Sequence, residues 1–103
     1  MTAPTLDLAI LATLEREPNH GFGIALQIQD SSGGLLIAEE GSLYPALHRL
    51  EKAGFLAAEW KPTDAGRRAR WYRLTASGKR RLAETRAQWE TLHKGLSRLL
   101  RYA

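Results

Sequence analysis

The chain has 103 residues and a net charge of +4, and 44% of its residues are hydrophobic, a balance that suits one globular domain and excludes a disordered chain. It has no cysteine, which excludes both a disulfide framework and a thiolate zinc site. The apolar run at residues 6–14 contains Asp7 and is too short to cross a bilayer, so we expect a cytoplasmic protein with no membrane partner.

Two helices are predicted in the first third of the chain. Residues 5–16 are apolar on most sides, which is typical of a helix buried on more than one face. The core of the domain is one partner for this helix and a second subunit is the other, with Leu6 and Ile10 as expected interface residues. A second helix is predicted over residues 20–31, and the glycine pair at 33–34 is expected to end it.

A short edge strand at residues 35–38 and a third helix are predicted next. This helix is expected to begin near Ser42, whose hydroxyl suits an N-cap, and to end at Gly54. The helical period divides it into two faces. The face that must contact the core holds Leu43, Leu47 and Leu50. The opposite face holds Tyr44, Pro45, His48, Arg49 and Lys52.

A β-hairpin follows, with strands predicted at residues 55–60 and 70–74 and turn residues between them. The fold class is therefore mainly α with a small β-hairpin. Three helices followed by a hairpin is the order of a winged helix-turn-helix domain, which we place at residues 1–74. Residues 75–103 are expected to form a long C-terminal dimerisation helix.

The last helix repeats its apolar residues at the interval of a coiled coil. Leu82, Trp89 and Leu96 are spaced seven apart, and a second series of the same interval contains Leu92 and Leu99. One interpretation is an amphipathic helix packed on its own domain. We favour a dimer seam formed by these five residues, because the first three helices already suffice for the core of the domain.

The basic residues concentrate around the hairpin. Residues 61–81 hold eight basic side chains and one acidic side chain, a net charge of +7, whereas residues 1–60 carry −5. This block favours a polyanionic partner over a merely soluble surface. Arg67 and Arg68 at the tip, with Arg70 behind them, are the strongest candidates for DNA contact, since arginine pairs with phosphate and fits a narrow minor groove. The alternative is a solvated hairpin whose charges protect a sheet edge.

The third helix supplies the other candidates for DNA contact, at positions suited to a major groove: Ser42, Tyr44, His48, Arg49 and Lys52. Each of them also has a purely structural interpretation. Ser42 could cap the helix, Tyr44 could pack its ring on a neighbour, and the two cations could pair with nearby acids.

No pattern in the chain indicates catalysis, a metal or a cofactor. The three histidines fall in different predicted elements without metal-ligand spacing, and no nucleophile with a base or phosphate-binding glycine loop is present. We therefore predict a protein that is not an enzyme. Trp89 has two interpretations: a packing residue of the seam, or the wall of a pocket between subunits where a planar aromatic molecule stacks.

Three segments together resemble the short subclass of the PadR family of bacterial transcriptional regulators. They are HGFGIALQI (20–28), GSLYPALHRLEKAGFL (41–56) and GRRARWYRLTASGKRRL (66–82). The resemblance implies a homodimeric winged-helix repressor of a palindromic operator, with the third helix in the major groove and the wing in the flanking minor groove. Some short members bind aromatic molecules at the dimer interface through a tryptophan placed like Trp89.

Two features depart from the family's usual pattern. Phe22 stands where a tyrosine is common, so a phosphate hydrogen bond from that hydroxyl is absent here. Glu39 and Glu40 precede the third helix, where they favour the helix dipole but repel phosphate. Two other functions remain as alternatives: a small-molecule sensor whose dimer pocket is the main site, and a protein-interaction module that has lost DNA binding.

Overall fold

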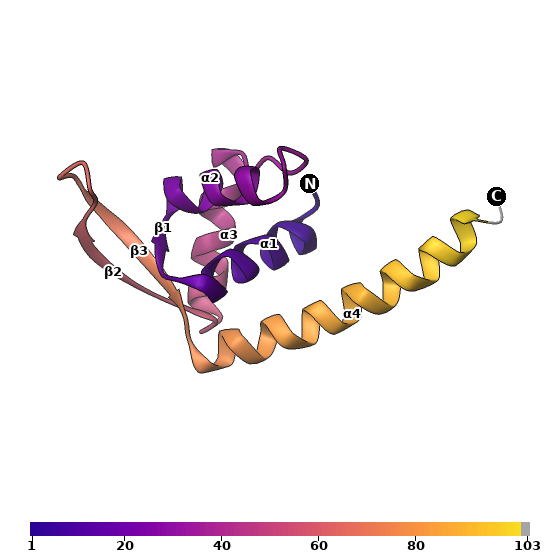
Figure 1. Ribbon diagram of the computed structural model, residues 1–103. Coiled ribbons are helices and arrows are strands. Elements are labelled where there is room, and N and C mark those ends of the chain that lie inside the picture. Colours follow the sequence, from indigo (N-terminus) through magenta and orange to yellow (C-terminus); the bar gives the residue numbers. More distant parts are fainter. Residues whose placement is uncertain (102–103) are drawn as a thin grey trace.

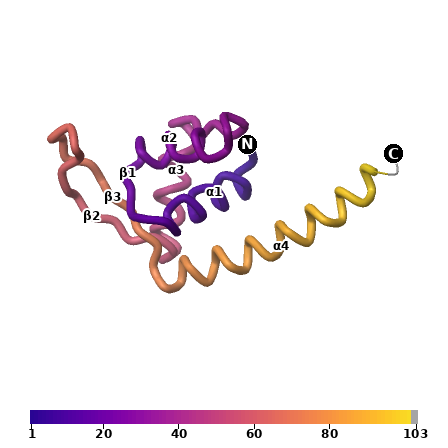
Figure 2. The backbone as a smooth tube through the Cα atoms, in the orientation of Figure 1, coloured from indigo at the N-terminus to yellow at the C-terminus, as the bar shows by residue number. Residues whose placement is uncertain are grey.

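Four helices and three strands make up residues 1–101, the part of the chain described by a computed structural model (Figure 1). Their order is α1 (Ala3–Arg16), β1 (Asn19–His20), α2 (Gly21–Ser31), α3 (Glu40–Lys52), β2 (Leu56–Pro62), β3 (Arg68–Leu74) and α4 (Ala76–Arg101). The winged-helix architecture with a long final helix is thereby confirmed. The helices α1 to α3 gather into one domain, the β2–β3 hairpin stands beside it as the wing, and α4 runs away from it (Figure 2).

Glycine ends the third helix, as the sequence predicted. Gly54 adopts a φ of 85°, and its amide donates to the carbonyl of Glu51 at 2.9 Å. The next amide, of Phe55, donates to the carbonyl of Leu50 at 3.0 Å. These two bonds satisfy carbonyls that the helix end leaves free, and they turn the chain into β2.

The start of α3 differs from the prediction. The helix begins at Glu40, with Glu39 as its N-cap, so Ser42 lies in the first turn and does not cap it. The amide of Ser42 donates to the carbonyl of Glu39 at 3.0 Å. An acid in the first turn is favourable there because the N-terminal end of a helix carries partial positive charge.

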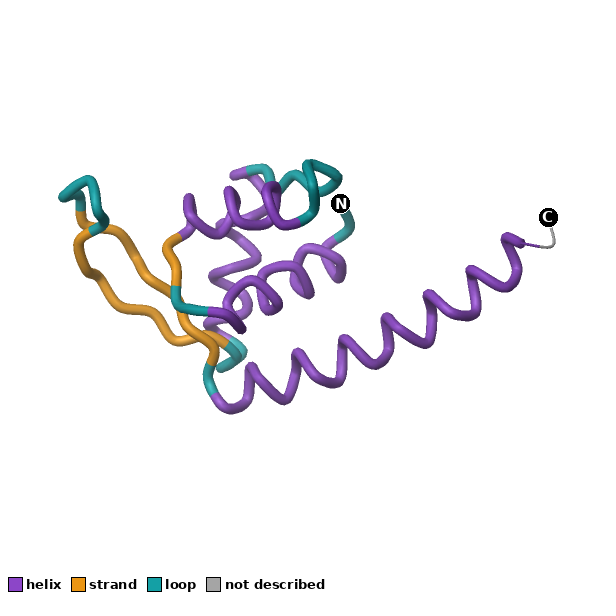
Figure 3. Tube along the Cα trace, viewed as in Figure 1, coloured by secondary structure: helices purple, strands orange, loops and turns teal. Residues whose placement is uncertain are grey.

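The sheet has the strand order β1-β3-β2, and both pairs are antiparallel (Figure 3). The predicted hairpin is confirmed, but the predicted edge strand at residues 35–38 is wrong, because the edge is formed by β1. Residues 35–38 instead form a loop in which the amide of Leu36 donates to the hydroxyl of Ser32 at 3.0 Å. A two-residue strand has no periodicity, so no sequence pattern marks β1.

One apolar core holds the three N-terminal helices, the base of the wing and the start of α4 together. It contains Leu6, Ile10 and Leu82, which expose only 4%, 0% and 1% of their surface. The prediction that these three residues form a dimer interface is therefore wrong, since a single chain already buries them. Within the described residues, no helix is both long and apolar enough to cross a membrane.

Candidate nucleic-acid interface

Helix α3 presents a buried face and an exposed face. The buried face holds Leu43, Ala46, Leu47 and Leu50, and it contacts the core as the leucine spacing predicted. His48 and Lys52 are exposed on the opposite face. Within residues 1–101, Lys52 forms no ion pair, so its charge is available to a phosphate.

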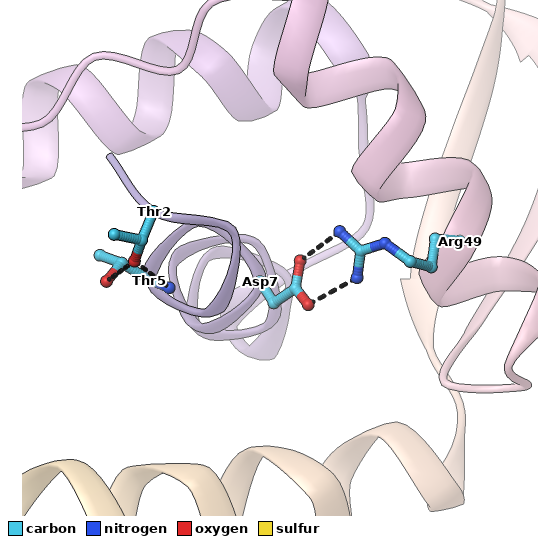
Figure 4. A network of polar contacts seen from close by, with 4 residues as sticks. All are labelled: Thr2, Thr5, Asp7 and Arg49. Atoms are coloured by element: carbon cyan, nitrogen blue, oxygen red, sulfur yellow. Dashed lines mark hydrogen bonds and ion pairs between the residues drawn. The ribbon is translucent and has the colours of Figure 1, made fainter.

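Arg49 forms a bidentate ion pair with Asp7 of α1 (Figure 4). Its two terminal nitrogens donate to the two carboxylate oxygens at 2.7 and 3.0 Å. The hydrogen bonds, followed by the attraction of the charge, raise the pKa of Arg49 above its ordinary value. The ion-pair interpretation of this residue is confirmed, and the pair joins α3 to α1; contact of Arg49 with DNA stays a prediction.

Substitution of either partner of this pair distinguishes positioning from base reading. We expect Arg49→Ala and Asp7→Ala to lower the free energy of unfolding by similar amounts, each about 0.5–1 kcal/mol for an exposed pair. If the pair only positions α3, both should shift the preference among DNA sequences in the same way, because both remove the same contact between α3 and α1. Thermal unfolding and binding to a panel of duplexes measure the two effects. A change of preference in Arg49→Ala alone would show that this arginine reads a base.

The other edge of α3 is joined to the wing. Arg70 of β3 forms an ion pair with Glu51 of α3, so its charge is balanced within the protein, and its contact with DNA stays a prediction. The hydrogen bond to Glu51 raises the pKa of the Arg70 guanidinium. Beside this pair lies a hollow of about 440 Å³, bordered by His48, Glu51, Lys52, Arg70 and Tyr72. The pair links α3 to β3 above the core that the two elements share.

Tyr44 and Ser42 occupy the first half of α3. The ring of Tyr44 lies against Gly21 at the start of α2, where an added Cβ would come within 2.6 Å of the ring. The interpretation of Tyr44 as a packing residue is thus confirmed, although its side chain stays partly exposed. Ser42 is exposed and lines a small hollow with residues 37–39.

The tip of the wing carries Arg67 and Arg68, both exposed. The turn before them is closed by two backbone bonds, from the amide of Gly66 to the carbonyl of Thr63 at 2.9 Å and from the amide of Thr63 to the carbonyl of Arg67 at 2.7 Å. Gly66 has a φ of 84°, a conformation that other residues rarely adopt. Among residues 1–101, neither arginine pairs with an acid, so both charges are free to meet an anion.

Helix α4 leaves an apolar row uncovered beyond the domain. Its members are Trp89, Leu92, Leu96, Leu99 and Leu100, and each exposes about half of its surface or more. The imidazole of His93 stacks on the indole of Trp89, with ring centroids 4.9 Å apart and planes 9° from parallel. The heptad residues of α4 therefore have two different surroundings. Leu82 packs in the core of the domain, whereas the later heptad residues lie outside the core of the described chain.

Asp7 and Glu51, the acids that pair with Arg49 and Arg70, are not marked by any pattern in the sequence. Each pair joins residues far apart in the chain, 42 and 19 positions, so no local spacing reveals them. The sequence indicates only that cations of the third helix can pair with nearby acids, without naming the acid. It did not distinguish Arg49 from Lys52, which stays free of ion pairs within residues 1–101.

Comparison with known proteins places this site in a family. The family model described as "Transcriptional regulator PadR-like family" matches residues 10–84. A Clostridium thermocellum transcriptional regulator of known structure is 26% identical, with a TM-score of 0.83 and 92% of each chain covered. A PadR family transcriptional regulator from Eggerthella lenta is 36% identical with a TM-score of 0.79, over 93% of this chain and 81% of that one. Transcriptional regulator Rv3488 of Mycobacterium tuberculosis is 48% identical over 52 residues, 50% of this chain and 48% of the relative.

The matched residues include α2, α3 and the wing, so the likeness covers the elements that carry the candidate DNA contacts. The relatives are regulators of transcription, in agreement with a site of basic and polar side chains. The chain belongs to the PadR-like family of transcriptional regulators.

Proposed function

We propose that two copies of this chain bind one palindromic operator and repress the gene that it controls. The observation that carries the DNA-binding part is the hollow between α3 and the wing, with the free charge of Lys52 on one side. The free charges of Arg67 and Arg68 lie at the tip of the wing beyond it. A duplex whose major groove takes the exposed face of α3 would bring its backbone and flanking minor groove to the wing.

The homodimer is proposed on the apolar row of α4. A row of large apolar side chains left outside the core of its own chain is typical of a protein-protein interface. A two-fold dimer through this row places two copies of α3 in opposite orientations, which is the reason for a palindromic operator. In this assignment residues 1–74 form the DNA-binding domain, and the part of α4 beyond Leu82 forms the seam.

An electrophoretic shift with duplex DNA from upstream of the protein's own gene tests the proposal directly. We expect a shifted complex whose affinity falls steeply as salt rises, because phosphate contacts release counterions. A reporter gene under the same DNA should be expressed less when the protein is present, and more expression would indicate activation instead. No shift even at low salt would favour the protein-interaction module.

Removal of the two arginines at the wing tip should weaken binding to every sequence. For Arg67→Ala/Arg68→Ala we expect the slope of log affinity against log salt to become shallower by about 0.9 for each phosphate that the variant no longer neutralises. Filter binding or anisotropy over a salt series measures this slope. Arg16→Ala/Arg98→Ala removes the same charge at the end of α1 and in the last turn of α4, and its slope should stay close to the unaltered one.

A second function, sensing of a planar aromatic molecule, is favoured by the exposed indole of Trp89. Its stacking on His93 indicates that this ring face accepts a flat partner. We propose that such a molecule replaces His93 on the indole and alters the spacing of the two wings, which changes DNA affinity. Quenching of fluorescence by planar dyes that disappears in Trp89→Ala, while Trp60→Phe and Trp71→Phe retain it, would support this site.

A further inference from the structure

The two faces of the wing have different surroundings. In an antiparallel pair, residues opposite each other share a face, and that face alternates along the strand. Leu56 pairs with Leu74, Ala58 with Tyr72, and Trp60 with Arg70, so these three pairs all lie on one face of the hairpin. This face, which we call the inner face, is the one directed to α3, because it buries both leucines in the core and places Arg70 against Glu51.

Trp60 continues the inner face beyond the reach of the core. It exposes 57% of its surface, whereas Leu56 at the base of the same strand exposes 2%. Two arginines share this face with it: Arg70, which is ion-paired with Glu51, lies directly opposite, and Arg68 is the next residue of β3 on that face toward the tip. A large aromatic ring in this place contributes little to the core, and it lies on the face that also carries Arg68, which is unpaired among the described residues.

Trp71, on the outer face of the wing, provides a contrast. Its Nε1–H donates to the carbonyl of Lys61 at 3.1 Å, and the ammonium of the same lysine lies 4.9 Å from its ring centroid. The ring of His20 meets it edge-on at 4.9 Å. Trp71 is thus a structural residue of the sheet, only partly accessible to solvent.

We propose that Trp60 is a DNA contact of the wing, packing its indole ring against the sugar-phosphate backbone on the inner face, between the groove that α3 enters and the groove that the wing tip enters. This inference rests on the proposed function and extends it to an uncharged residue. The face of the ring can contact the C–H groups of a deoxyribose, and the indole N–H is a donor that suits a phosphate oxygen. The charge of Arg68, which forms no ion pair within residues 1–101, attracts the backbone to this face, and Trp60 adds contact area without charge.

Fluorescence tests the contact in the full-length protein. Titration with duplex DNA from upstream of the gene should change tryptophan emission of the unaltered chain, since a nucleotide that packs on an indole alters its surroundings. The change should disappear in Trp60→Phe and persist in Trp71→Phe, which alters the outer face. A change of emission that survives in Trp60→Phe, with binding itself confirmed by gel shift, would overturn the proposal.

Affinity provides the second test. We expect Trp60→Ala to bind about tenfold more weakly to every duplex, the scale for loss of one hydrogen bond to a charged oxygen. Its salt slope should be unchanged, whereas Arg67→Ala/Arg68→Ala lowers that slope. Unaltered affinity in Trp60→Ala, at an unaltered melting temperature, would contradict the inference. Failure of the unaltered protein to bind DNA would contradict the proposed function instead, so the two failures are distinguishable.

Discussion

Replacement of Leu92 and Leu96 by aspartate is expected to convert the protein to a monomer while the domain stays folded. Both leucines lie on the uncovered row of α4 and expose 58% and 48% of their surface, so their substitution removes nothing from the core of the single chain. Two buried like charges on each side of a two-fold seam would repel and remain unsolvated. Sedimentation analysis should give the mass of one chain for Leu92→Asp/Leu96→Asp and twice that mass for the unaltered protein.

Disruption of the dimer should also weaken binding to DNA. A dimer places its second DNA-binding domain at a high effective concentration once the first is bound, and separate monomers lack this gain, which amounts to about a hundredfold or more. Affinity for a single half-site should change little.

The matched control for this pair is Ala87→Asp/Thr91→Asp, which adds the same charge to exposed positions elsewhere on α4. It should remain dimeric and bind as the unaltered protein does. If both double variants become monomeric, acidity along the helix rather than the apolar row is responsible. If Leu92→Asp/Leu96→Asp remains a dimer, the assignment of the seam is wrong.

Gly78→Ala should destabilise the domain strongly, although alanine favours helix formation. Gly78 is buried in the first turn of α4, where an added Cβ would overlap the carbonyl oxygen of Phe55 and come within 3.2 Å of Cδ2 of Leu74. The Phe55 carbonyl is backbone and also accepts the amide of Thr75 at 3.1 Å, so it cannot move aside freely. This junction connects the end of α3, the base of the wing and the start of α4.

The size of the effect follows from two opposed contributions. The higher helix propensity of alanine contributes about 1 kcal/mol in its favour, and overpacking against backbone costs about 1–3 kcal/mol or more. The clash would also displace the Phe55 carbonyl from its hydrogen bond with the Thr75 amide. We therefore expect the free energy of unfolding to fall by about 2 kcal/mol, which lowers the melting temperature by roughly 10 °C. Circular dichroism during heating measures it.

Gly95→Ala is the matched control in the same helix. An added Cβ at Gly95 meets no atom within 4 Å, so only the propensity term acts and helix content should rise. An equal melting temperature for Gly78→Ala and the unaltered protein would show that the junction yields, contrary to the close packing of Gly78 against Phe55.

Most of the fold could be predicted from residue patterns because its signals are local. The leucine period of α3, the glycine that ends it and the turn residues of the wing act over a few neighbouring positions. Errors arose where a structure depends on pairing between distant segments. The edge strand was placed at residues 35–38 by apolar composition, whereas β1 exists only because Asn19 and His20 meet β3.

The sequence predicts which elements carry the candidate site, but it does not predict which of their side chains are paired or buried within the protein. Residue patterns alone established that basic residues concentrate in the wing, that α3 has one polar face, and that α4 has a heptad row. The folded chain was needed to show that Arg49 and Arg70 are held by acids of other elements, whereas Arg67, Arg68 and Lys52 form no ion pair within residues 1–101. It was also needed to assign Leu82 to the core and Trp60 to the inner face of the wing. The difference arises because charge and hydrophobicity belong to a residue, whereas burial and pairing depend on what the folded chain brings beside it.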